Sequence, residues 1–257
     1  MIERKIYRGK VEDVLPSFPN CFADLVVADP PFNKSKKYDN YDDNLEEETY
    51  LNLSEIWIRE GFRILKSTGT FWMYCPTQWL GDFQVIGKRY GIWQNTICWH
   101  YTNPTPQQKR FPKTWSAWLF FSKSQNFKFF PKFEKSIESF HTNRQIGTKE
   151  GSGIYDVWSD ISKLTGGYLA QREVVLKPNT NQRMFVYQLP LALLRRIIGF
   201  CTEKEDLVVD LFSHSGTTSI AAQLMGRNWI AIEQSELYCK EIEKRISKMS
   251  FGILKND

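Results

Sequence analysis

The chain has 257 residues, 42% of them hydrophobic and 25% charged, which predicts a folded α/β domain with a sizeable core and excludes a disordered chain. Its five cysteines are odd in number and scattered without a CxxC pair, so neither a disulfide framework nor a zinc site is indicated. No apolar run approaches the ~18 residues that span a membrane, and the charged start MIERKIYRGK lacks a signal-peptide core. We therefore expect a cytoplasmic protein with no membrane anchor and no metal site.

The first third of the chain predicts a strand, a loop and a long helix. The stretch VVADPPFN (residues 26–33) closes an apolar strand, expected over residues 24–28, with an acid and two prolines. The acidic run from Asp39 to Glu48 is better explained as a solvated loop at a helix N-terminus than as a metal site. Apolar residues at three- and four-residue steps predict a helix over Tyr50–Leu65. A strand after a Thr-Gly turn (STGTFWMYC) and another in GIWQNTICWHY follow.

The segment from His100 to Glu150 holds much of the positive charge. Nine Lys or Arg stand there against three Glu, a balance of +6 in a chain whose net charge is +5, and eleven aromatic residues accompany them. A basic, aromatic segment is typical of a nucleic-acid-binding surface. The alternative is a solvated loop face over a small core. The DNA-binding candidates are Lys109, Arg110, Lys113, Lys123 and Arg144.

The last third predicts a helix over Leu189–Phe200, opened by Pro190, and then a complete βαβ unit. The unit consists of a strand ending at Asp210, the turn FSHSGTT, a helix, and a strand ending at Glu233, which indicates a doubly wound parallel sheet. Small residues in the turn let backbone amides approach a ligand, and an acid about 20 residues farther on suits ribose hydroxyls. A P-loop is excluded because no Lys follows Gly216, and the GxGxxG pattern of dinucleotide folds is incomplete. A βαβ unit without a ligand is the alternative.

The residues of DPPF suit the activation of a planar amine. If the ligand is S-adenosylmethionine, its sulfonium methyl needs a nucleophile, and an exocyclic base amine attacks poorly while its lone pair is delocalised. Asp29 can accept one N–H of that amine and the carbonyl of Pro30 the other, while Phe32 offers a face for stacking. In a duplex the nucleotide must first be flipped out, at a cost of roughly a few kcal/mol.

Together, DPPF and DLFSHSGTT…AIE resemble the DNA amino-methyltransferases, which modify adenine N6 or cytosine N4. The catalytic tetrapeptide comes first and the cofactor unit last, which resembles the β-type order of that family over residues 5–247. The resemblance implies a mixed, mostly parallel seven-stranded sheet with flanking helices, S-adenosylmethionine as methyl donor, and double-stranded DNA as substrate. It divides the chain into a catalytic half (1–99), a target-recognition region (100–175) and a cofactor-binding half (176–257).

The resemblance assigns two sets of site residues. The catalytic and base-binding set is Asp29, Pro30, Pro31 and Phe32. The cofactor-binding set is Asp210, Phe212, Ser213, Ser215, Gly216, Thr217, Thr218, Glu233, Gln188 and Pro190.

Three positions depart from the family's pattern. His214 replaces the first glycine of the cofactor turn, and we expect it to be a packing residue rather than a general base. Lys10 replaces an acid near the N-terminus, unless Glu12 or Asp13 substitutes for it. Leu189 replaces the lysine of the late cofactor loop, unless Lys177 and Pro178 are the matching pair. Because the tetrapeptide is intact, we still expect activity.

The Asp that opens DPPF favours adenine N6 as the target, whereas NPTPQQKR and VYQLP resemble the cytosine-N4 group. An RNA or protein amino-methyltransferase is disfavoured because those enzymes tend to place the cofactor motif first. A non-catalytic DNA-binding module is a third alternative. The resemblance leaves open a homodimer and a partner restriction endonuclease, and the sequence does not determine which bases are recognised.

Overall fold

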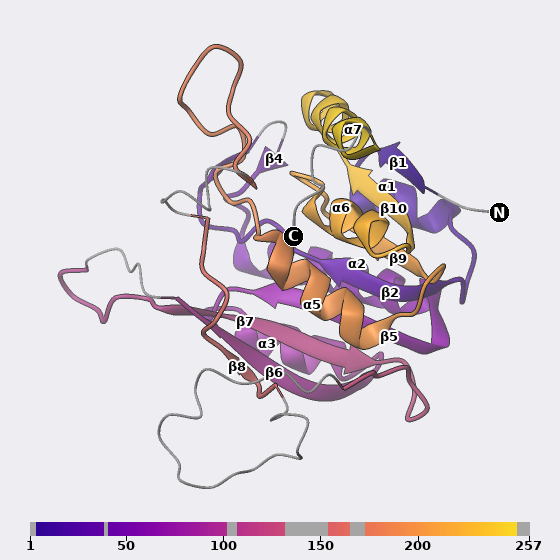
Figure 1. The fold of residues 1–257 in the computed structure, drawn as a ribbon. Coiled ribbons are helices and arrows are strands. Elements are labelled where there is room, and N and C mark those ends of the chain that lie inside the picture. The colour runs from indigo at the N-terminus through magenta and orange to yellow at the C-terminus, as the bar shows by residue number, and fades with distance from the viewer. Residues whose placement is uncertain (1–3, 39–40, 102–106, 132–153, 165–172, 251–257) are drawn as a thin grey trace, which may run out of the picture.

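The computed structural model describes residues 4–38, 41–101, 107–131, 154–164 and 173–250, and these form an eight-stranded sheet in the order β1-β10-β9-β2-β5-β7-β6-β8 (Figure 1). The strands are β1 (Arg4–Arg8), β2 (Ala23–Ala28), β5 (Leu65–Cys75), β6 (Ile92–His100), β7 (Trp115–Ser122), β8 (Val157–Trp158), β9 (Leu207–Asp210) and β10 (Asn228–Glu233). The first five strands of that order, from β1 through β10, β9 and β2 to β5, are mutually parallel. β7 is antiparallel to both of its neighbours, β5 and β6, and β8 is parallel to β6. The mixed, mostly parallel α/β fold is confirmed. The sheet formed by the described residues has one strand more than the expected seven, because the two-residue β8 extends its edge beyond β6.

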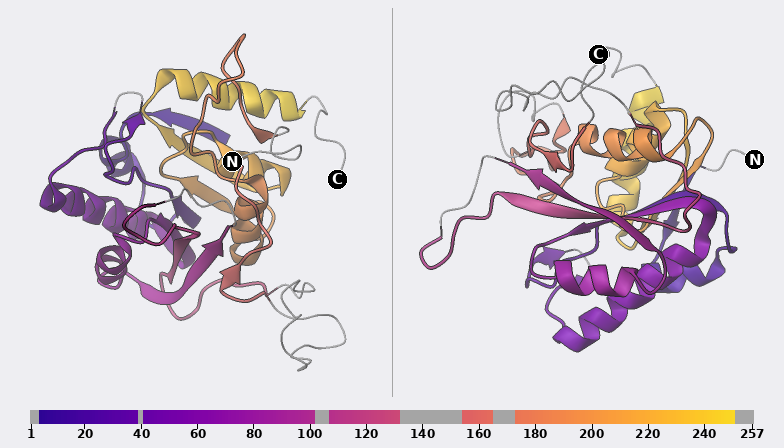
Figure 2. Two further views of the ribbon diagram at one scale, coloured as in Figure 1. Left: turned by 90° about the vertical axis from the view of Figure 1, so that its left-hand side faces the viewer. Right: turned by 90° about the horizontal axis from the view of Figure 1, so that it is seen from below.

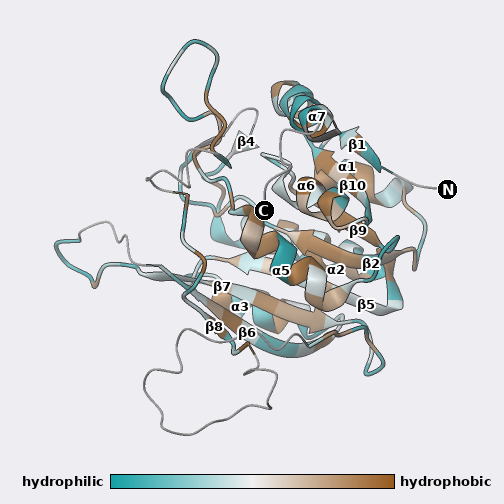
Figure 3. Cartoon of the chain, viewed as in Figure 1, coloured by the Kyte–Doolittle hydropathy of each residue, from teal (hydrophilic) through white to brown (hydrophobic). Residues whose placement is uncertain are grey.

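Helices cover both faces of the sheet. They are α1 (Val11–Val14), α2 (Glu47–Ile64), α3 (Leu80–Gly87), α5 (Leu191–Cys201), α6 (Thr217–Leu224) and α7 (Glu236–Ser250), and β3 (Lys37–Tyr38) and β4 (Tyr41–Asp42) form a separate two-stranded pair. α1, α2 and α3 share one buried cluster with the sheet, and α5 and α6 share the other (Figure 2, right). Figure 3 shows hydrophobic residues along the central strands and hydrophilic residues on the loops. Within the described ranges, no helix has the length and apolar character needed to cross a membrane.

All six residues of β2 are buried, and all but Asp24 are apolar. Val26 packs in the cluster beneath α2, whereas Leu25 and Val27 pack in the cluster beneath α5. Such a strand has no solvent face. Asp29, the residue after its carboxyl end, is therefore the first at that end whose side chain can face a cavity instead of the core.

The two strands that precede the motifs are neighbours. From β2 the chain crosses through α2 to β5, and from β9 it crosses through α6 to β10 on the other side. The two crossovers cover opposite faces, so a crevice opens at the carboxyl ends of β2 and β9. The register pairs Val27 with Asp210, and the N–H of Leu211 donates to the carbonyl of Val27 at 2.9 Å. Asp29 and Asp210 are therefore brought to the same edge of the sheet.

Local details differ from the predictions. α2 begins at Glu47 rather than Tyr50, because Glu47 and Glu48 interact favourably with the helix N-terminus. α5 begins at Leu191, with Pro190 as its N-cap residue. β5 continues through the expected Thr-Gly turn, although its register against β2 shifts there.

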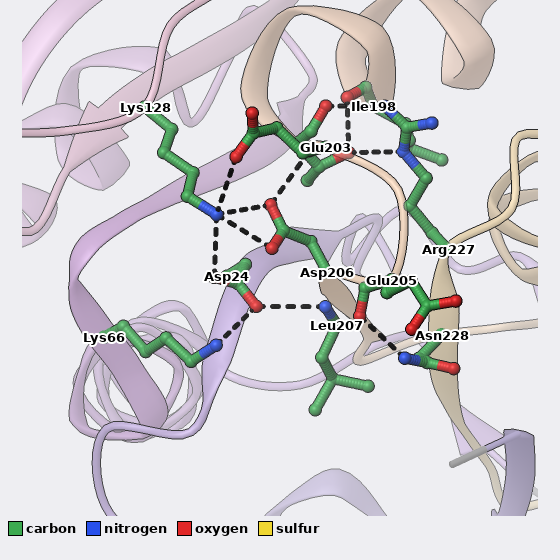
Figure 4. A network of polar contacts seen from close by, with 11 residues as sticks. Asp24, Lys66, Lys128, Ile198, Glu203, Glu205, Asp206, Leu207, Arg227 and Asn228 are labelled. Atoms are coloured by element: carbon green, nitrogen blue, oxygen red, sulfur yellow. Dashed lines mark hydrogen bonds and ion pairs between the residues drawn. The ribbon is translucent and has the colours of Figure 1, made fainter. Parts of the chain in front are cut away.

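A polar network ties the opposite end of the sheet together (Figure 4). The carboxylate of Asp24, only 3% exposed, accepts from Lys66 Nζ at 2.7 Å and from the N–H of Leu207 at 3.0 Å. Lys128 Nζ lies 2.7 Å from a carboxylate oxygen of Asp206 and 3.5 Å from one of Asp24. This lysine of the basic segment therefore joins β2 to the start of β9, away from the site.

We expect Asp24→Ala to lower the free energy of unfolding by about 2–4 kcal/mol, because it leaves Lys66 and the half-buried N–H of Leu207 without their acceptor. Asp24→Asn should lose less, since its amide oxygen can still accept from that N–H. Urea unfolding of both variants measures this. Equal stability of Asp24→Ala and the unaltered protein would contradict it.

Candidate active site

A cavity of about 480 Å³ opens at the carboxyl ends of β2 and β9. Seven of the predicted catalytic and cofactor-binding residues line it: Asp29, Pro30, Pro31, Phe32, Gln188, Phe212 and Glu233. A smaller recess beside it joins Asp29 to the turn, and its lining includes Asp210, Ser213, Ser215, Thr217 and Thr218. The structure thus brings the tetrapeptide and the cofactor turn, about 180 residues apart in the sequence, to one place.

Two predicted residues lie behind the cavity wall. Gly216 is the N-cap of α6 at φ +73°, and a Cβ there would lie 2.8 Å from Ile242 Cγ2, so glycine permits both the turn and the close packing of α7. Pro190 is buried at the start of α5 and is absent from the cavity lining. Both shape the site without facing it.

The backbone of DPPF is held from the α2–α3 side. The hydroxyl of Tyr50 donates to the carbonyl of Pro31 at 2.7 Å, and Trp79 Nε1 donates to the carbonyl of Phe32 at 2.9 Å. These two bonds leave the carbonyl of Pro30 as the adjacent acceptor of the tetrapeptide. The loop is therefore rigid where an incoming group would be bound.

The acidic run is not a solvated loop throughout, and the prediction is wrong for Asp43, which is 2% exposed. Its carboxylate accepts from the backbone N–H groups of Asn33, Lys34 and Lys36 at 2.7, 2.9 and 3.0 Å. The side chain of Asn33 exchanges two further hydrogen bonds with the backbone of Leu45. Asp43 is buried because it satisfies the backbone of the loop that follows the tetrapeptide.

The carboxylate of Asp29 lies in an environment that disfavours its charge. Burial, together with the nearby Asp210, raises the pKa of Asp29 well above its usual value, and Lys36 opposes that rise. Burial also raises the pKa of Asp210 to about 6. The ring of Phe32 lies 5.4 Å from that of Tyr74, so an aromatic wall stands beside the acid.

The cofactor turn is closed by Glu233. The N–H of His214 donates to Glu233 Oε2 at 2.7 Å, and the N–H of Ser235 donates to Oε1 at 2.8 Å. Burial raises the pKa of Glu233 to about 7. Each carboxylate oxygen keeps a second lone pair for a ligand hydroxyl.

His214 adopts φ +45°, in the left-handed region that favours glycine, which explains why a glycine suits this position. Its ring packs 4.9 Å from Phe185 and 5.4 Å from Tyr238. Burial lowers the pKa of His214 to about 4, so the ring is neutral near pH 7. These contacts support the prediction of a packing residue.

The structure shows which nearby acid can substitute for the one that Lys10 replaces. Lys10 and Glu12 both line the cavity, and Trp57 Nε1 donates to Glu12 Oε2 at 3.2 Å. Glu12, and not Asp13, is therefore the acid that the structure places at the cavity. Trp57 and Trp99 are buried and also form part of the cavity lining.

The predicted DNA-binding residues are scattered. Lys113 lines the cavity, whereas Lys109 and Arg110 are exposed on the same loop. Lys123 lies at the far end of the sheet, where Nζ donates to the carbonyl of Phe62 at 2.6 Å, and the structure does not bring it to the site. Arg144 lies outside the described residues.

Three cavity lysines were not predicted from the sequence: Lys34, Lys36 and Lys163. The first two follow DPPF directly, so their closeness in sequence was an available signal. Lys163 comes from the far end of the predicted recognition region, and no local pattern marks it. β7 and β8 of that region belong to the central sheet, and its role in recognition stays a prediction.

The cavity suits a nucleoside ligand on its Glu233 side. Its volume lies in the range of small-molecule sites, Trp57 and Tyr238 contribute aromatic walls, and Glu233 offers oxygens for vicinal hydroxyls. On the opposite side, Asp29 and Phe32 offer an acceptor and a flat face. Among the described residues, no group of three or more His, Cys, Asp and Glu could hold a metal ion.

Comparisons with known proteins agree with this geometry. A family model described as DNA methylase matches residues 23–244. The type II methyltransferase M.HinfI of Haemophilus influenzae is 29% identical over 264 residues, which cover 95% of this chain and 68% of that protein. Among solved structures, the PvuII DNA methyltransferase (cytosine-N4-specific) is similar with a TM-score of 0.69 at 20% identity, covering 99% of this chain and 94% of that one. The M1.HpyAVI–SAM complex is similar with a TM-score of 0.63 at 21% identity, covering 96% and 100%. At these identities the two structures bear on the fold alone.

The raised pKa of Glu233 predicts a pH-dependent stability difference. Because the pKa is about 7 in the folded chain against an ordinary 4.5, the folded state holds the proton more tightly than the unfolded state. The contribution of this group to stability therefore falls as pH rises from about 4.5 to about 7.5. Across that window, the free energy of unfolding of the unaltered protein should fall by up to about 3 kcal/mol relative to that of Glu233→Gln.

The measurement is the free energy of unfolding of both proteins, without ligand, at pH 5, 6, 7 and 8. Taking the difference between the two removes the opposite trend of His214, whose pKa is lowered. A difference that stays constant with pH, or that grows in favour of the unaltered protein, would contradict the assignment.

Proposed function

The chain belongs to the family of S-adenosylmethionine-dependent DNA methylases that modify adenine N6 or cytosine N4, and from that membership we propose that it methylates N6 of an adenine flipped out of double-stranded DNA. One observation carries the proposal: Asp29 and Glu233 line a single cavity from opposite sides of the β2–β9 junction. An activated methyl group and a base amine can therefore meet between them.

The cofactor half of the site is assigned to the turn after β9 and the end of β10. When bound, S-adenosylmethionine supplies an electrophilic methyl on a sulfonium. Glu233 accepts the ribose hydroxyls, and Phe212 and Trp57 contribute aromatic surface beside them. M1.HpyAVI, whose fold is similar, has been solved as a complex with this cofactor.

The base half is assigned to DPPF. Asp29 accepts one N–H of the exocyclic amine, the carbonyl of Pro30 accepts the other, and Phe32 stacks on the ring. The bonds from Tyr50 to Pro31 and from Trp79 to Phe32 fix the loop, so these acceptors are oriented before the base arrives. Drawing both N–H groups out of the ring plane restores the nitrogen lone pair.

The raised pKa of Asp29 suits the proton that the amine must lose once it has gained a methyl group. A carboxylate whose pKa is raised is a stronger base, so Asp29 is suited to take the proton that the amine loses when the methyl group passes from the sulfonium to the nitrogen. Release to solvent then restores the carboxylate. Asp29 thus serves first as a hydrogen-bond acceptor for the amine and then as the base that takes its proton.

The choice of adenine rests on the Asp at the first position of DPPF, and cytosine N4 is the alternative because of NPTPQQKR and VYQLP. A cytoplasmic location, a homodimer and a partner restriction endonuclease stay predictions. The two other classes, an RNA or protein methyltransferase and a non-catalytic DNA-binding module, are disfavoured by the family membership and by the open cavity.

The product identifies the target base. We expect plasmid DNA incubated with the protein and S-adenosylmethionine carrying a labelled methyl group to yield labelled N6-methyladenine after digestion to nucleosides. Sequencing of the modified positions then gives the recognition site. Labelled N4-methylcytosine would support the alternative target, and no labelled nucleoside would refute the proposed activity.

Asp29→Ala should lower the rate of methyl transfer by at least about 100-fold while S-adenosylmethionine still binds, because the variant removes the acceptor but leaves the cofactor turn intact. Single-turnover kinetics and calorimetric titration measure the two properties. Asp82→Ala, which removes an exposed acid from α3, is the control and should keep the normal rate. A folded Asp29→Ala protein with a normal rate would show that the catalytic assignment is wrong.

A further inference from the structure

Four lysines meet at the base half of the cavity, and we call them the lysine cluster: Lys34, Lys36, Lys113 and Lys163. They come from three segments, namely the loop after DPPF, the loop before β7, and the segment after β8. The cluster is opposite in charge to the cofactor half, where Glu12 and Glu233 lie. Positive charge is therefore concentrated on the side of Phe32, although Lys10 and Arg183 also line the cavity.

Two of the four ammonium groups lie over aromatic rings that line the cavity. Lys163 Nζ is 3.3 Å from the ring centroid of Tyr101, and Lys36 Nζ is 3.5 Å from that of Tyr187. Lys36 Nζ is also 5.7 Å from the ring centroid of Phe32, on which the base is proposed to stack. Cations and a stacking face thus stand side by side, as in sites that bind nucleic acid strands.

The cluster is poorly neutralised from within. Among the described residues, none of its four ammonium groups forms an ion pair with a carboxylate at 4.0 Å or less. Asp43, the nearby buried acid, is engaged by three backbone N–H groups. Burial, together with the neighbouring lysines, lowers the pKa of Lys113 and of Lys163 to about 8. An arriving anion would relieve this repulsion.

Resting on the proposed function, we propose that the lysine cluster is a phosphate-binding site that holds the DNA backbone next to the extruded nucleotide. A nucleotide that leaves the stack keeps its two flanking phosphates, so these enter the mouth of the cavity with it. Phosphate contacts fix the position of a strand without selecting its bases. The cluster would thus hold the target nucleotide in place, and recognition would depend on other residues.

The carboxylate of S-adenosylmethionine is the competing anion. It is disfavoured because the cluster neighbours Asp29, Phe32 and Tyr101, on the base side of the cavity. If the cluster bound the cofactor instead, its variants would weaken cofactor binding. That outcome is separable from the proposal by titration.

The test compares Lys113→Gln, Lys163→Gln and the double variant with Lys88→Gln. Lys88 is a matched control because its Nζ also lies over an aromatic ring, at 5.1 Å from the centroid of Trp93, but it does not line the cavity. Each single variant should bind duplex DNA about 5- to 10-fold more weakly and lower the slope of log Kd against log salt by about 1. S-adenosylmethionine affinity and melting temperature should be unchanged, and Lys163→Arg should restore DNA binding.

A chemical double-mutant cycle locates the contact. In a duplex carrying the mapped methylation site, the phosphates flanking the target nucleotide are replaced by uncharged methylphosphonates. The replacement should weaken binding to the unaltered protein about 5- to 10-fold but have little further effect on the double variant, because the same contact is already lost. Additive losses, an unchanged salt slope or weakened cofactor binding would each overturn the proposal. Failure of the proposed function is distinct, since the unaltered protein would then methylate no DNA.

Discussion

The parallel pairing of β2 with β9 is the constraint on which the site depends. Their register sets Val27 opposite Asp210, so the residues that follow each strand emerge at one edge of the sheet. The crossovers through α2 and α6 leave in opposite directions and cover opposite faces, which keeps that edge open. A shift of one residue would turn the buried positions of β2 to the opposite face and separate the two motifs. Core packing and site geometry are therefore consequences of the same pairing.

The edge is supported by residues that never reach a substrate. Tyr50 on α2 and Trp79 before α3 bind the carbonyls of DPPF, while Asp43 binds the backbone just after it. At the other end of the sheet, Asp24 joins β2 to β5 and β9 through Lys66 and Leu207. Polar side chains thus fix both ends of a strand whose middle is held by packing and by backbone pairing with β5 and β9. This arrangement lets the tetrapeptide be rigid without being buried in the core.

Electrostatics divide the cavity into two halves. Glu12 and Glu233 stand on the side proposed for a positively charged cofactor, and the lysine cluster stands on the side proposed for a polyanion. Asp29 lies between them, and burial raises the pKa of its carboxyl. A gradient of this kind orients a sulfonium and a phosphodiester in opposite directions before either makes a short contact. Burial raises the pKa of Glu233, and the nearby Asp210 adds to that rise.

The sequence by itself determined the local chemistry: a strand ending in DPPF, a βαβ unit ending in Glu233, and the small residues of the turn between, because strand periodicity and turn composition are local properties. The tertiary structure decided what depends on contacts between distant segments. Asp43 appeared to be a solvated acid until its three backbone partners were seen, and Lys123 and Lys128 appeared to belong to a DNA surface although they bind backbone and acids at the far end of the sheet. Lys163 has no local signal at all and joins the cavity only because β8 pairs with β6. The sequence shows how many charged residues are present, whereas only the fold shows which of them have partners.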